Sequence, residues 1–429
     1  GTEKCPFEGG CPKLSAYNKI TRNNACWCGF KDALHQTTDL GGICLFIVVI
    51  ITIIFMINIA DKSKCCGCNA CVQKCPKQCI SMHEDEEGFL YPKVGLDLCI
   101  DCHLCEKVCP VLNQGEPHQP LKAYAAITTN EELRMKSSSG GIFTLLAEAV
   151  ICEGGVVFGA LFDENWEVKH DYTESLEGLV AFRCSKYVQS RIGNSYKKTQ
   201  DFLKNNRTVL FSGTSCQIAG LKLFLNKEYD NLITVDIVCH GVPSPLIWRE
   251  YLATIANKPD IKSITHKEKN SGWRRYSISV EMNDKIVTER AANNKYMLAF
   301  AQNLTLRQSC FECSAKAGKC CSDITLGDFW GIEHVKPTLD DDRGTSFVCV
   351  NTERGNALLS KTNAIYSEVD YDASIPYNSC IVKSTNKPQG RELFWKKYSE
   401  QGIVVLFHLK PKKNNIIKRI IKRIIKSAR

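Results

Sequence analysis

The sequence lacks the short motifs by which many enzymes bind nucleotides. No G-x-G-x-x-G follows a strand-like segment, and no G-x-x-x-x-G-K-[ST] occurs in the chain. Neither a Rossmann dinucleotide site nor a P-loop is therefore supported. A signal peptide with a charged start and a small-residue cleavage site is also missing. One nearly uninterrupted apolar run, residues 43–57, is shorter than the about 20 residues of a membrane-spanning helix.

The body of the chain lacks an excess of positive charge. The formal net charge is +9, but residues 410–429 hold nine Lys or Arg and no Asp or Glu, so this tail carries the whole excess. Nucleic acid is therefore not an expected partner. Isoleucines at helical spacing opposite the basic residues predict a basic amphipathic helix over residues 411–429. Such a helix suits the surface of an anionic membrane, and docking on this protein or on a partner is the open alternative.

Residues 1–55 fit poorly with the rest of the chain. Four cysteines at irregular spacing precede the apolar run: Cys5, Cys11, Cys26 and Cys28. Two interpretations stay open, a membrane anchor or an extension upstream of a chain that starts at Met56, the first methionine. We favour the extension and assign no role to these four cysteines.

Cysteine is abundant, with 25 residues in a chain of 429. A chain of this length buries a core without disulfides, and the missing signal peptide argues against an oxidising compartment. We therefore expect a cytoplasmic protein whose thiolates bind metal, with membrane association through the tail as an addition.

A repeat organises the cysteines of residues 56–113. Cys65, Cys68, Cys71, Cys75 and Pro76 recur, each shifted by 34 positions, as Cys99, Cys102, Cys105, Cys109 and Pro110. The run C-x2-C-x2-C-x3-C-P is typical of the bacterial ferredoxins with two [4Fe–4S] clusters, in which the fourth cysteine serves the other cluster. The expected ligand sets are Cys65, Cys68, Cys71 and Cys109 for one cluster, and Cys99, Cys102, Cys105 and Cys75 for the second.

Two structural zinc sites are the competing interpretation of this repeat. Zinc sites usually show paired C-x2-C units. This repeat instead has three cysteines at C-x2-C-x2-C spacing followed by C-P, so we favour the clusters. Two further cysteines of the segment, Cys66 and Cys79, are expected to be thiols that bind no metal.

The rest of the chain predicts an α/β domain. Residues 114–120, QGEPHQP, form a polar connector and the expected domain boundary. After it, strand-like runs such as GVVFGALF, TVLFSG and LITVDIVC alternate with helix-like stretches. Alternating stretches between residues 263 and 289 predict a hairpin, so part of the sheet is expected to be antiparallel. The expected fold class is α+β or α/β, a ferredoxin-like domain followed by a mixed-sheet domain.

Four cysteines in the α/β part have distinctive surroundings. Cys216 in FSGTSCQIAGL and Cys239 in DIVCHGVPSP each follow a strand-like run, where a turn would expose the thiol at the edge of the sheet. Cys310 and Cys313 form a C-x2-C pair, with Cys320 and Cys321 close by. A lone cysteine is usually a small hydrophobic residue, and the pair fits half of a zinc site as well as part of a cluster site. The residues alone leave a third cluster open.

Five ordered motifs resemble one family. KSSSGGIFTLLAEAV, SKYVQSRIG, VLFSGTSCQIAGL, DIVCHGVPSP and SDITLGDFWGIE are together similar to the beta subunits of coenzyme F-420-reducing hydrogenases and F-420 dehydrogenases. The closest likeness is to bacterial members with a ferredoxin domain in front, often linked to surface-polysaccharide genes, and it covers roughly residues 56–400. The resemblance implies an FAD-containing domain over residues 121–400. It also implies a third [4Fe–4S] cluster, with Cys216, Cys239, Cys310 and Cys313 at the ligand positions.

The sequence departs from the family pattern at a few positions. Ser215 and Gln308 stand where the family commonly has Pro, and Cys184 where it has Gly. Cys184 bears on the flavin pocket because it lies beside Ser185, Lys186 and Tyr187. Cys320 or Cys321 stays open as a replacement for one member of the third ligand set.

The flavin site is expected around two segments. Ser137, Ser138, Ser139, Gly140 and Gly141 precede a helical run, where backbone N–H groups suit a pyrophosphate, although a plain helix cap is the alternative. Lys186 is a candidate catalytic residue that would offset phosphate or reduced-flavin charge, against a solvated surface lysine. His240 is the second candidate, for a hydrogen bond to flavin or to a cluster sulfur, against a turn histidine. Asp328 in LGDFWG is a candidate flavin or substrate contact, against a turn role.

The expected function is that of an iron–sulfur flavoprotein oxidoreductase. Electrons would pass between the clusters and a flavin that exchanges hydride with a soluble carrier, such as coenzyme F-420, or with an organic substrate. A redox partner protein is the other expected partner. The alternatives are a ferredoxin-type protein that docks on a separate enzyme, including one of surface-polysaccharide synthesis, and a transferase or binding module of such a pathway with structural clusters.

Overall fold

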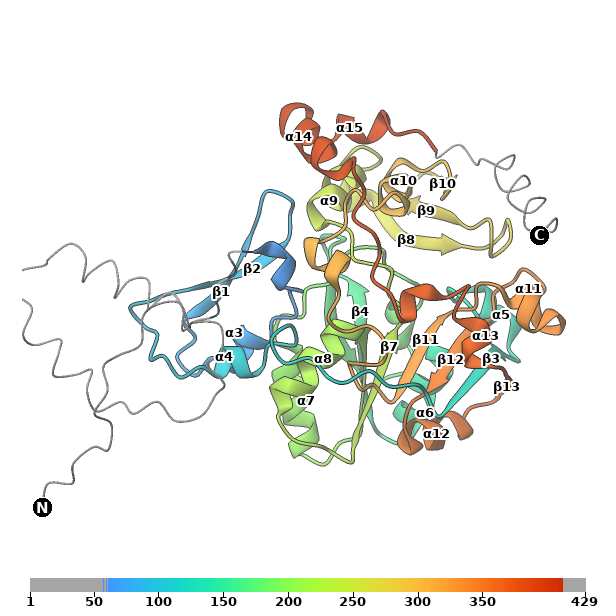
Figure 1. The fold of residues 1–429 in the computed structure, drawn as a ribbon. Helices are drawn as coiled ribbons and strands as arrows, with labels where there is room; N and C mark the ends of the chain where they lie inside the picture. Colours follow the sequence, from blue (N-terminus) through green and yellow to red (C-terminus); the bar gives the residue numbers. More distant parts are fainter. Residues whose placement is uncertain (1–56, 58, 60, 412–429) are drawn as a thin grey trace, which may run out of the picture. The chain divides into compact units, whose positions relative to one another are not determined.

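The computed structural model describes residues 57, 59 and 61–411 (Figure 1). The extension or anchor expected in residues 1–55 lies outside this range, as does the expected tail helix apart from Pro411. Among the described residues, no helix is both long enough and apolar enough to cross a membrane.

The cysteine repeat is also a repeat of structure. The segment begins with the short helix η3 (Lys62–Lys64). The helices α3 (Ala70–Lys74) and α4 (Leu104–Lys107) then occupy equivalent positions in the two halves. Each begins after a residue with left-handed backbone, Asn69 at φ 63° and His103 at φ 56°. Between them, β1 (Ile80–Glu84) pairs antiparallel with β2 (Leu90–Val94). This is the ferredoxin-like segment that the spacing predicts.

Eight strands form a mixed sheet in the order β13-β3-β12-β11-β7-β6-β4-β5. They are β3 (Lys122–Thr128), β4 (Val156–Phe162), β5 (Val168–Thr173), β6 (Val209–Thr214), β7 (Leu232–Ile237), β11 (Ile324–Asp328), β12 (Ser346–Val350) and β13 (Ala364–Glu368). The central strands β4, β6, β7 and β11 run parallel, and the remaining pairings are antiparallel. The expected mixed sheet is therefore confirmed.

Helices cover both faces of this sheet (Figure 1). α6 (Ile142–Cys152) and α12 (Glu353–Ser360) pack on one face, and α7 (Ser195–Lys204) and α8 (Ser215–Leu225) on the other. Along β6, Val209 and Phe211 join the core on the α8 side, whereas Leu210 joins the core on the α6 side. Because successive strand residues point to opposite faces, a strand covered on both sides needs a continuous apolar run, as TVLF provides.

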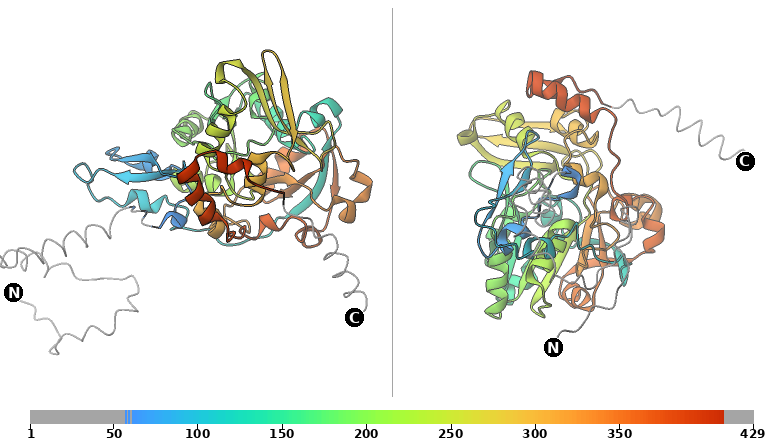
Figure 2. Two further views of the ribbon diagram at one scale, coloured as in Figure 1. Left: turned by 90° about the horizontal axis from the view of Figure 1, so that it is seen from above. Right: turned by 60° about the vertical axis from the view of Figure 1, so that its left-hand side comes forward.

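A second, three-stranded sheet packs beside the first. Its antiparallel strands, in the order β10-β9-β8, are β8 (Ile261–Glu268), β9 (Ser277–Met282) and β10 (Ile286–Arg290). Figure 2 shows them in yellow. The expected hairpin is thus confirmed as β9 and β10, but it does not extend the main sheet. Its buried side chains Ile278, Val280 and Met282 instead form a core with α9 (Pro245–Ala253) and α10 (Lys295–Ala301).

Short helices complete the described chain. They are α5 (Glu131–Met135), α11 (Ile332–Val335), α13 (Tyr371–Ser374), α14 (Arg391–Gln401), α15 (Val404–Phe407), η4 (Gly178–Phe182), η5 (Lys258–Asp260), η6 (Gln308–Glu312), η7 (Pro337–Leu339) and η8 (Ser379–Ile381). Phe394 of α14 and Leu406 of α15 join the core of the three-stranded sheet. The connector 114–120 contains no helix or strand, and its role as a domain boundary remains a proposal.

Candidate functional site

The carboxyl ends of the parallel strands bring three of the expected residues to one edge of the sheet. β6 ends at Thr214, which caps α8 together with Gln217, so Cys216 lies in the first turn of that helix. Cys239 follows the end of β7, and Asp328 is the last residue of β11. In open α/β sheets, ligands bind in the crevice beyond this edge. The topology therefore concentrates the expected site residues where such folds hold ligands.

One pocket at this edge contains all four thiols expected to bind a third cluster. Its lining includes Cys66, Cys216, Cys239, Cys310 and Cys313. Cys310 belongs to η6, and Cys313 follows it. By contrast, Cys320 is buried in the core beside α8, Cys321 is exposed, and neither lines this pocket. The fifth thiol, Cys66, comes from the ferredoxin-like segment.

Positive charge lies next to this thiol pocket. Arg307, fully buried, and Lys316 both line it. Lys316 donates from Nζ to the carbonyl oxygens of Cys239 and Cys380. Arg307 donates from Nε to the carbonyl oxygen of Cys65 at 2.7 Å. Cations beside a set of thiolates offset the negative charge of a bound cluster, so the pocket fits a [4Fe–4S] group by donor set and by charge.

The surroundings of this pocket shift its thiols toward the protonated form. Burial raises the pKa of Cys239 to about 12 and also raises the pKa of Cys310 and of Cys313. A hydrogen bond with Cys66, followed by burial, raises the pKa of Cys216. Metal binding requires thiolates, so cluster insertion here would release protons.

A second pocket contains the four thiols expected for one ferredoxin cluster. Cys75, Cys99, Cys102 and Cys105 line it together with Cys79. The Sγ atoms of Cys75 and Cys79 are 3.3 Å apart. This pocket combines one cysteine from the first half of the repeat with three from the second half. That exchange between halves is the arrangement expected of two-cluster ferredoxins.

The remaining ferredoxin ligand set also lies together. Cys71 and Cys109 are buried in one core cluster, and Cys68 is buried nearby. Burial, and then the neighbouring thiols of Cys65 and Cys109, raise the pKa of Cys71 to about 12. Across the described part of the chain, no three His, Cys, Asp or Glu side chains are placed to hold a single metal ion.

The expected flavin residues form a separate cluster. Ser138 accepts a hydrogen bond from the backbone N–H of Ser185 at 2.6 Å, and the two hydroxyls are 3.0 Å apart. Tyr187 lies close to Tyr276 and to Asp328, and these neighbours add to burial in raising the pKa of the Tyr187 phenol. The structure thus brings together residues from the two segments and from the end of β11.

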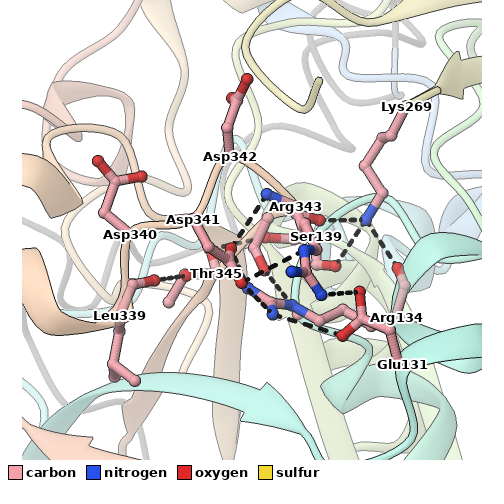
Figure 3. A network of polar contacts seen from close by, with 12 residues as sticks. Glu131, Arg134, Ser139, Lys269, Leu339, Asp340, Asp341, Asp342, Arg343 and Thr345 are labelled. Carbon is pink, nitrogen blue, oxygen red and sulfur yellow. Dashed lines mark hydrogen bonds and ion pairs between the residues drawn. The ribbon is translucent and has the colours of Figure 1, made fainter. Parts of the chain in front are cut away.

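A network of hydrogen bonds and ion pairs fixes the backbone of the segment 137–141 (Figure 3). Arg134 donates to both carboxylate oxygens of Asp341 at 2.7 Å, and Lys269 donates to the carbonyl oxygens of Arg134, Ser139 and Arg343. Ser139 donates to the carbonyl oxygen of Thr345. The hydroxyl and the carbonyl oxygen of Ser139 are therefore both engaged in hydrogen bonds within the protein.

Gly140 and Gly141 serve tight backbone packing. The N–H of Gly140 donates to the Ser346 hydroxyl at 3.0 Å, and a Cβ at Gly140 would lie 2.2 Å from the carbonyl oxygen of Ala126. Gly141 caps α6 with φ +86°. Ser138 is therefore the member of this segment whose side chain faces the Cys184–Tyr187 stretch, and its neighbours hold the helix end in place.

Beside Asp328, aromatic rings enclose a buried lysine. Lys267 forms an ion pair with Asp328, and its Nζ lies 5.3 Å from the ring centre of Trp273, 5.4 Å from that of Tyr276 and 5.5 Å from that of Trp330. Trp273 donates from Nε1 to Asp328 at 3.3 Å. Asp328 thus has two structural partners, Lys267 and Trp273, and its expected contact with flavin or substrate stays a prediction.

Two further lysines add positive charge to this cluster. Burial lowers the pKa of Lys186 to about 8, and burial followed by the charge of Lys267 lowers the pKa of Lys269 to about 8. Lys186 donates to the carbonyl oxygens of Ala181, Arg183 and Cys184. The lysines of this cluster outnumber its one carboxylate, so its charge suits an anionic group.

The two candidate catalytic residues, Lys186 and His240, have different surroundings. His240 lines the thiol pocket, donates from Nε2 to Asn303 at 2.7 Å, and has Nδ1 3.5 Å from Cys380 Sγ. Phe300 connects the two regions, because its ring centre is 5.5 Å from that of His240 and 5.1 Å from that of Tyr187. The arrangement suits His240 to the cluster site and Lys186 to the flavin site.

Sequence reasoning missed several polar residues of these sites. They are Arg307, Lys316 and Cys380 around the thiols, and His266, Lys267, Lys269, Trp273 and Tyr276 around Asp328. His266 accepts from the Tyr187 N–H at 2.8 Å, and its buried Nε2 has no partner among the described residues. No spacing signal marks these residues, because they lie on the three-stranded sheet, in loops or, in the case of Cys380, in the three-residue helix η8.

Comparison with known proteins identifies both parts of the chain. Residues 206–371 match the model for the C terminus of the coenzyme F-420 hydrogenase/dehydrogenase beta subunit, and residues 64–113 match that of the 4Fe-4S dicluster domain. The chain thus combines a 4Fe-4S dicluster domain with the C-terminal region of the F-420 hydrogenase/dehydrogenase beta subunit family. It is an iron–sulfur electron-transfer protein with a ferredoxin domain near the N-terminal end of the described residues.

Individual relatives match over shorter stretches. A seven-iron ferredoxin of Hydrogenibacillus schlegelii is 48% identical over 42 residues, which is 10% of this chain and 47% of that protein. An uncharacterized ferredoxin of Methanocaldococcus jannaschii is 36% identical over 52 residues, 12% of this chain and 66% of that protein. The chain thus spans about half to two thirds of these curated relatives.

A solved structure is similar to a larger part of the chain. It is that of the F-420-reducing [NiFe] hydrogenase complex from Methanosarcina barkeri, with 17% identity and a TM-score of 0.41 over 61% of this chain and 91% of that chain.

Proposed function

We propose that the protein is an iron–sulfur flavoprotein oxidoreductase with three [4Fe–4S] clusters and one FAD. The flavin would exchange hydride with a soluble carrier similar to coenzyme F-420, or with an organic substrate. The observation that supports this most directly is the pocket lined by Cys216, Cys239, Cys310 and Cys313. It contains a thiol of the ferredoxin-like segment, Cys66. Phe300 links it to the group of Lys186, Lys267 and Lys269 beside Tyr187 and Asp328, here called the lysine cluster.

Each ligand set would have a defined place in the chain. Residues 56–113 would hold two clusters, on Cys65, Cys68, Cys71 and Cys109 and on Cys75, Cys99, Cys102 and Cys105. Residues 121–400 would hold the third cluster and the flavin. Bound clusters accept and release single electrons, and a bound flavin supplies two-electron hydride chemistry. The charges that this chain contributes, Arg307 and Lys316, would stabilise the clustered thiolates.

The lysine cluster would hold the flavin. Ser138 and Ser185 offer hydroxyls, and Lys186 and Lys269 offer ammonium groups that donate to backbone carbonyls. A phosphate or a reduced isoalloxazine carries negative charge, which these ammonium groups would offset. The Nε2 atom of the buried His266 would serve as a hydrogen-bond partner for the same ligand.

The test is the flavin content of the whole chain purified without oxygen. Acid-released flavin is identified by chromatography, and the protein is then mixed with reduced coenzyme F-420 while flavin and cluster absorbance are recorded. We expect about one FAD per chain, bleached by a hydride donor before the clusters. Protein with its iron in place and no flavin would instead support the ferredoxin-type alternative.

A further inference from the structure

β10 is an exposed edge strand of the three-stranded sheet. It pairs with β9 on one side, and every residue of Ile286–Arg290 is exposed. Among the described residues, no strand pairs with its other side. Ile286 is 64% exposed and Val287 is 37% exposed, although both side chains are large and apolar. An open edge of this kind is a template on which another strand can pair.

The register with β9 determines which backbone groups of β10 point to the open edge. The N–H of Met282 donates to the carbonyl oxygen of Lys285 at 2.8 Å, at the start of the ladder. Because hydrogen-bonded pairs alternate along an antiparallel ladder, Val287 and Glu289 also direct their N–H and C=O groups to β9. The residues that alternate with them direct the same groups to the open edge: Ile286, Thr288 and Arg290.

The sequence of this edge is complementary to itself. In an antiparallel pair related by a two-fold axis, a strand faces its own sequence in reverse order. With the axis at Val287, Ile286 of one chain faces Thr288 of the second copy, and both have backbone groups that point outward to form hydrogen bonds. Lys285 then faces Glu289 of the second copy, twice by symmetry, at the closely spaced positions of the ladder.

Other two-fold registers lack this complementarity. An axis at Thr288 places Val287 opposite Glu289, and an axis at Ile286 places Lys285 opposite Val287. An axis at Glu289 places two carboxylates opposite each other. Opposite charges directly across a strand pair stabilise it, and like charges destabilise it. The charge pattern therefore selects the axis at Val287.

We propose that β10 is a dimer interface, on which a second copy of this chain pairs antiparallel about a two-fold axis at Val287 and joins the two small sheets into one. The occupant is a second copy because the edge complements its own sequence in charge and in backbone hydrogen bonding. Asn294 donates to Glu289 Oε2 at 3.0 Å and so holds this carboxylate beside the strand. A contact of one short strand buries less than the about 1,200 Å² of a standard interface, so the dimer dissociates on dilution.

The first test is sedimentation velocity of the whole chain, purified without oxygen, over about a hundredfold range of concentration. We expect an equilibrium between monomer and dimer in wild type. Thr288→Pro removes an outward N–H without removing a hydrogen bond to β9, and should raise the dissociation constant about tenfold. Thr288→Val is the matched control, because it keeps the N–H and loses only the hydroxyl, which is 2.9 Å from Ser279 Oγ. Both variants should retain the iron content of wild type, which shows that they fold.

The second test concerns the charges. Lys285→Glu and Glu289→Lys each place like charges across the pair, so each should weaken the dimer about tenfold. An equimolar mixture of the two variants restores opposite charges at both positions and should form a heterodimer, which a fluorescent label on one variant makes visible. A mixture that stays monomeric would overturn this register.

The remaining outcomes also decide the proposal. Monomeric wild type at the highest concentration would overturn it. A dimer that Thr288→Pro leaves intact would overturn it as well, because another surface would then hold the dimer. Dimerisation only after removal of residues 412–429 would assign the open edge to that segment instead of a second copy.

Discussion

Arg307 donates a hydrogen bond from Nε to the carbonyl oxygen of Cys65 at 2.7 Å, and from Nη2 to the carbonyl oxygen of Leu90 at 2.9 Å. The first carbonyl belongs to an expected cluster ligand and the second to β2. The guanidinium also lies 4.1 Å from the ring centre of Tyr91. One fully buried side chain of the α/β part therefore holds the ferredoxin segment at two points.

Replacing Arg307 with methionine should loosen the ferredoxin segment. The variant leaves two partly buried carbonyl oxygens without a donor, and an unsatisfied group costs about 1–3 kcal/mol when it is fully buried. We expect faster cleavage of the connector 114–120 by a protease that cuts unfolded chain, with the α/β fragment remaining. The exposed Arg290 of β10 provides the control, Arg290→Met. Equal cleavage of both variants and wild type would mean that Arg307 does not hold the segment.

A buried ion pair provides the second connection between these parts. Arg391 of α14 binds both carboxylate oxygens of Glu87, and their side chains are 1% and 9% exposed. We expect Glu87→Gln to lower the free energy of unfolding by about 3–5 kcal/mol, because Arg391 keeps a buried charge without its partner. The double variant Glu87→Gln with Arg391→Met should lose less than the single variant. Glu86→Gln, at a side chain 77% exposed, is the control and should change unfolding by less than about 0.5 kcal/mol.

Acid should destabilise the fold through a buried histidine. Burial lowers the pKa of His170 to about 4, although its hydrogen bond to the Ser212 carbonyl acts the other way. The unfolded chain takes up this proton below about pH 6.5, so between about pH 6.5 and 4 it binds more protons than the folded chain, and stability falls as pH falls. His170→Gln can still donate to Ser212.

We therefore expect the guanidinium midpoint of His170→Gln to fall less than that of wild type between about pH 7.5 and 5.5. The difference is at most about 1.4 kcal/mol per pH unit for one proton. His408→Gln, at an exposed position, is the control and should follow wild type. Parallel curves for His170→Gln and wild type would contradict the account.

The lysine cluster should determine flavin content without affecting iron. Lys269→Met removes an ammonium group and three hydrogen bonds to the carbonyl oxygens of Arg134, Ser139 and Arg343. We expect this variant to lose most of its flavin at an unchanged iron content. Lys262→Met changes an exposed lysine of β8 and should retain both. Full flavin content in Lys269→Met would mean that the lysine cluster does not bind the flavin.

Patterns within one segment could be predicted from the sequence. The shift of 34 positions predicts two equivalent halves, and the structure places α3 and α4 at equivalent positions with left-handed Asn69 and His103 before them. Continuous apolar runs predict β4, β6 and β7, because strands covered on both faces need them. The thiols Cys216 and Cys239 follow such strands, so their common edge is also a consequence of the pattern.

The surroundings of individual polar side chains could not be predicted. Lys262 and Lys267 lie on the same strand, yet the first is exposed and the second is fully buried. Register shifts between β8 and β9, one of them at Thr265 and Glu268, coincide with two consecutive buried residues, His266 and Lys267. A β-bulge breaks the alternation on which strand reading depends. Arg307 likewise lies in a loop whose neighbours come from distant parts of the chain.

The most direct test of the account is the iron and acid-labile sulfide content of the anaerobically purified chain, compared with that of the double variant Cys239→Ala with Cys313→Ala. Three clusters predict about twelve irons and twelve sulfides in wild type and about eight of each in the variant. About eight of each in both proteins would contradict the account, because the thiol pocket of the α/β part would then hold no cluster.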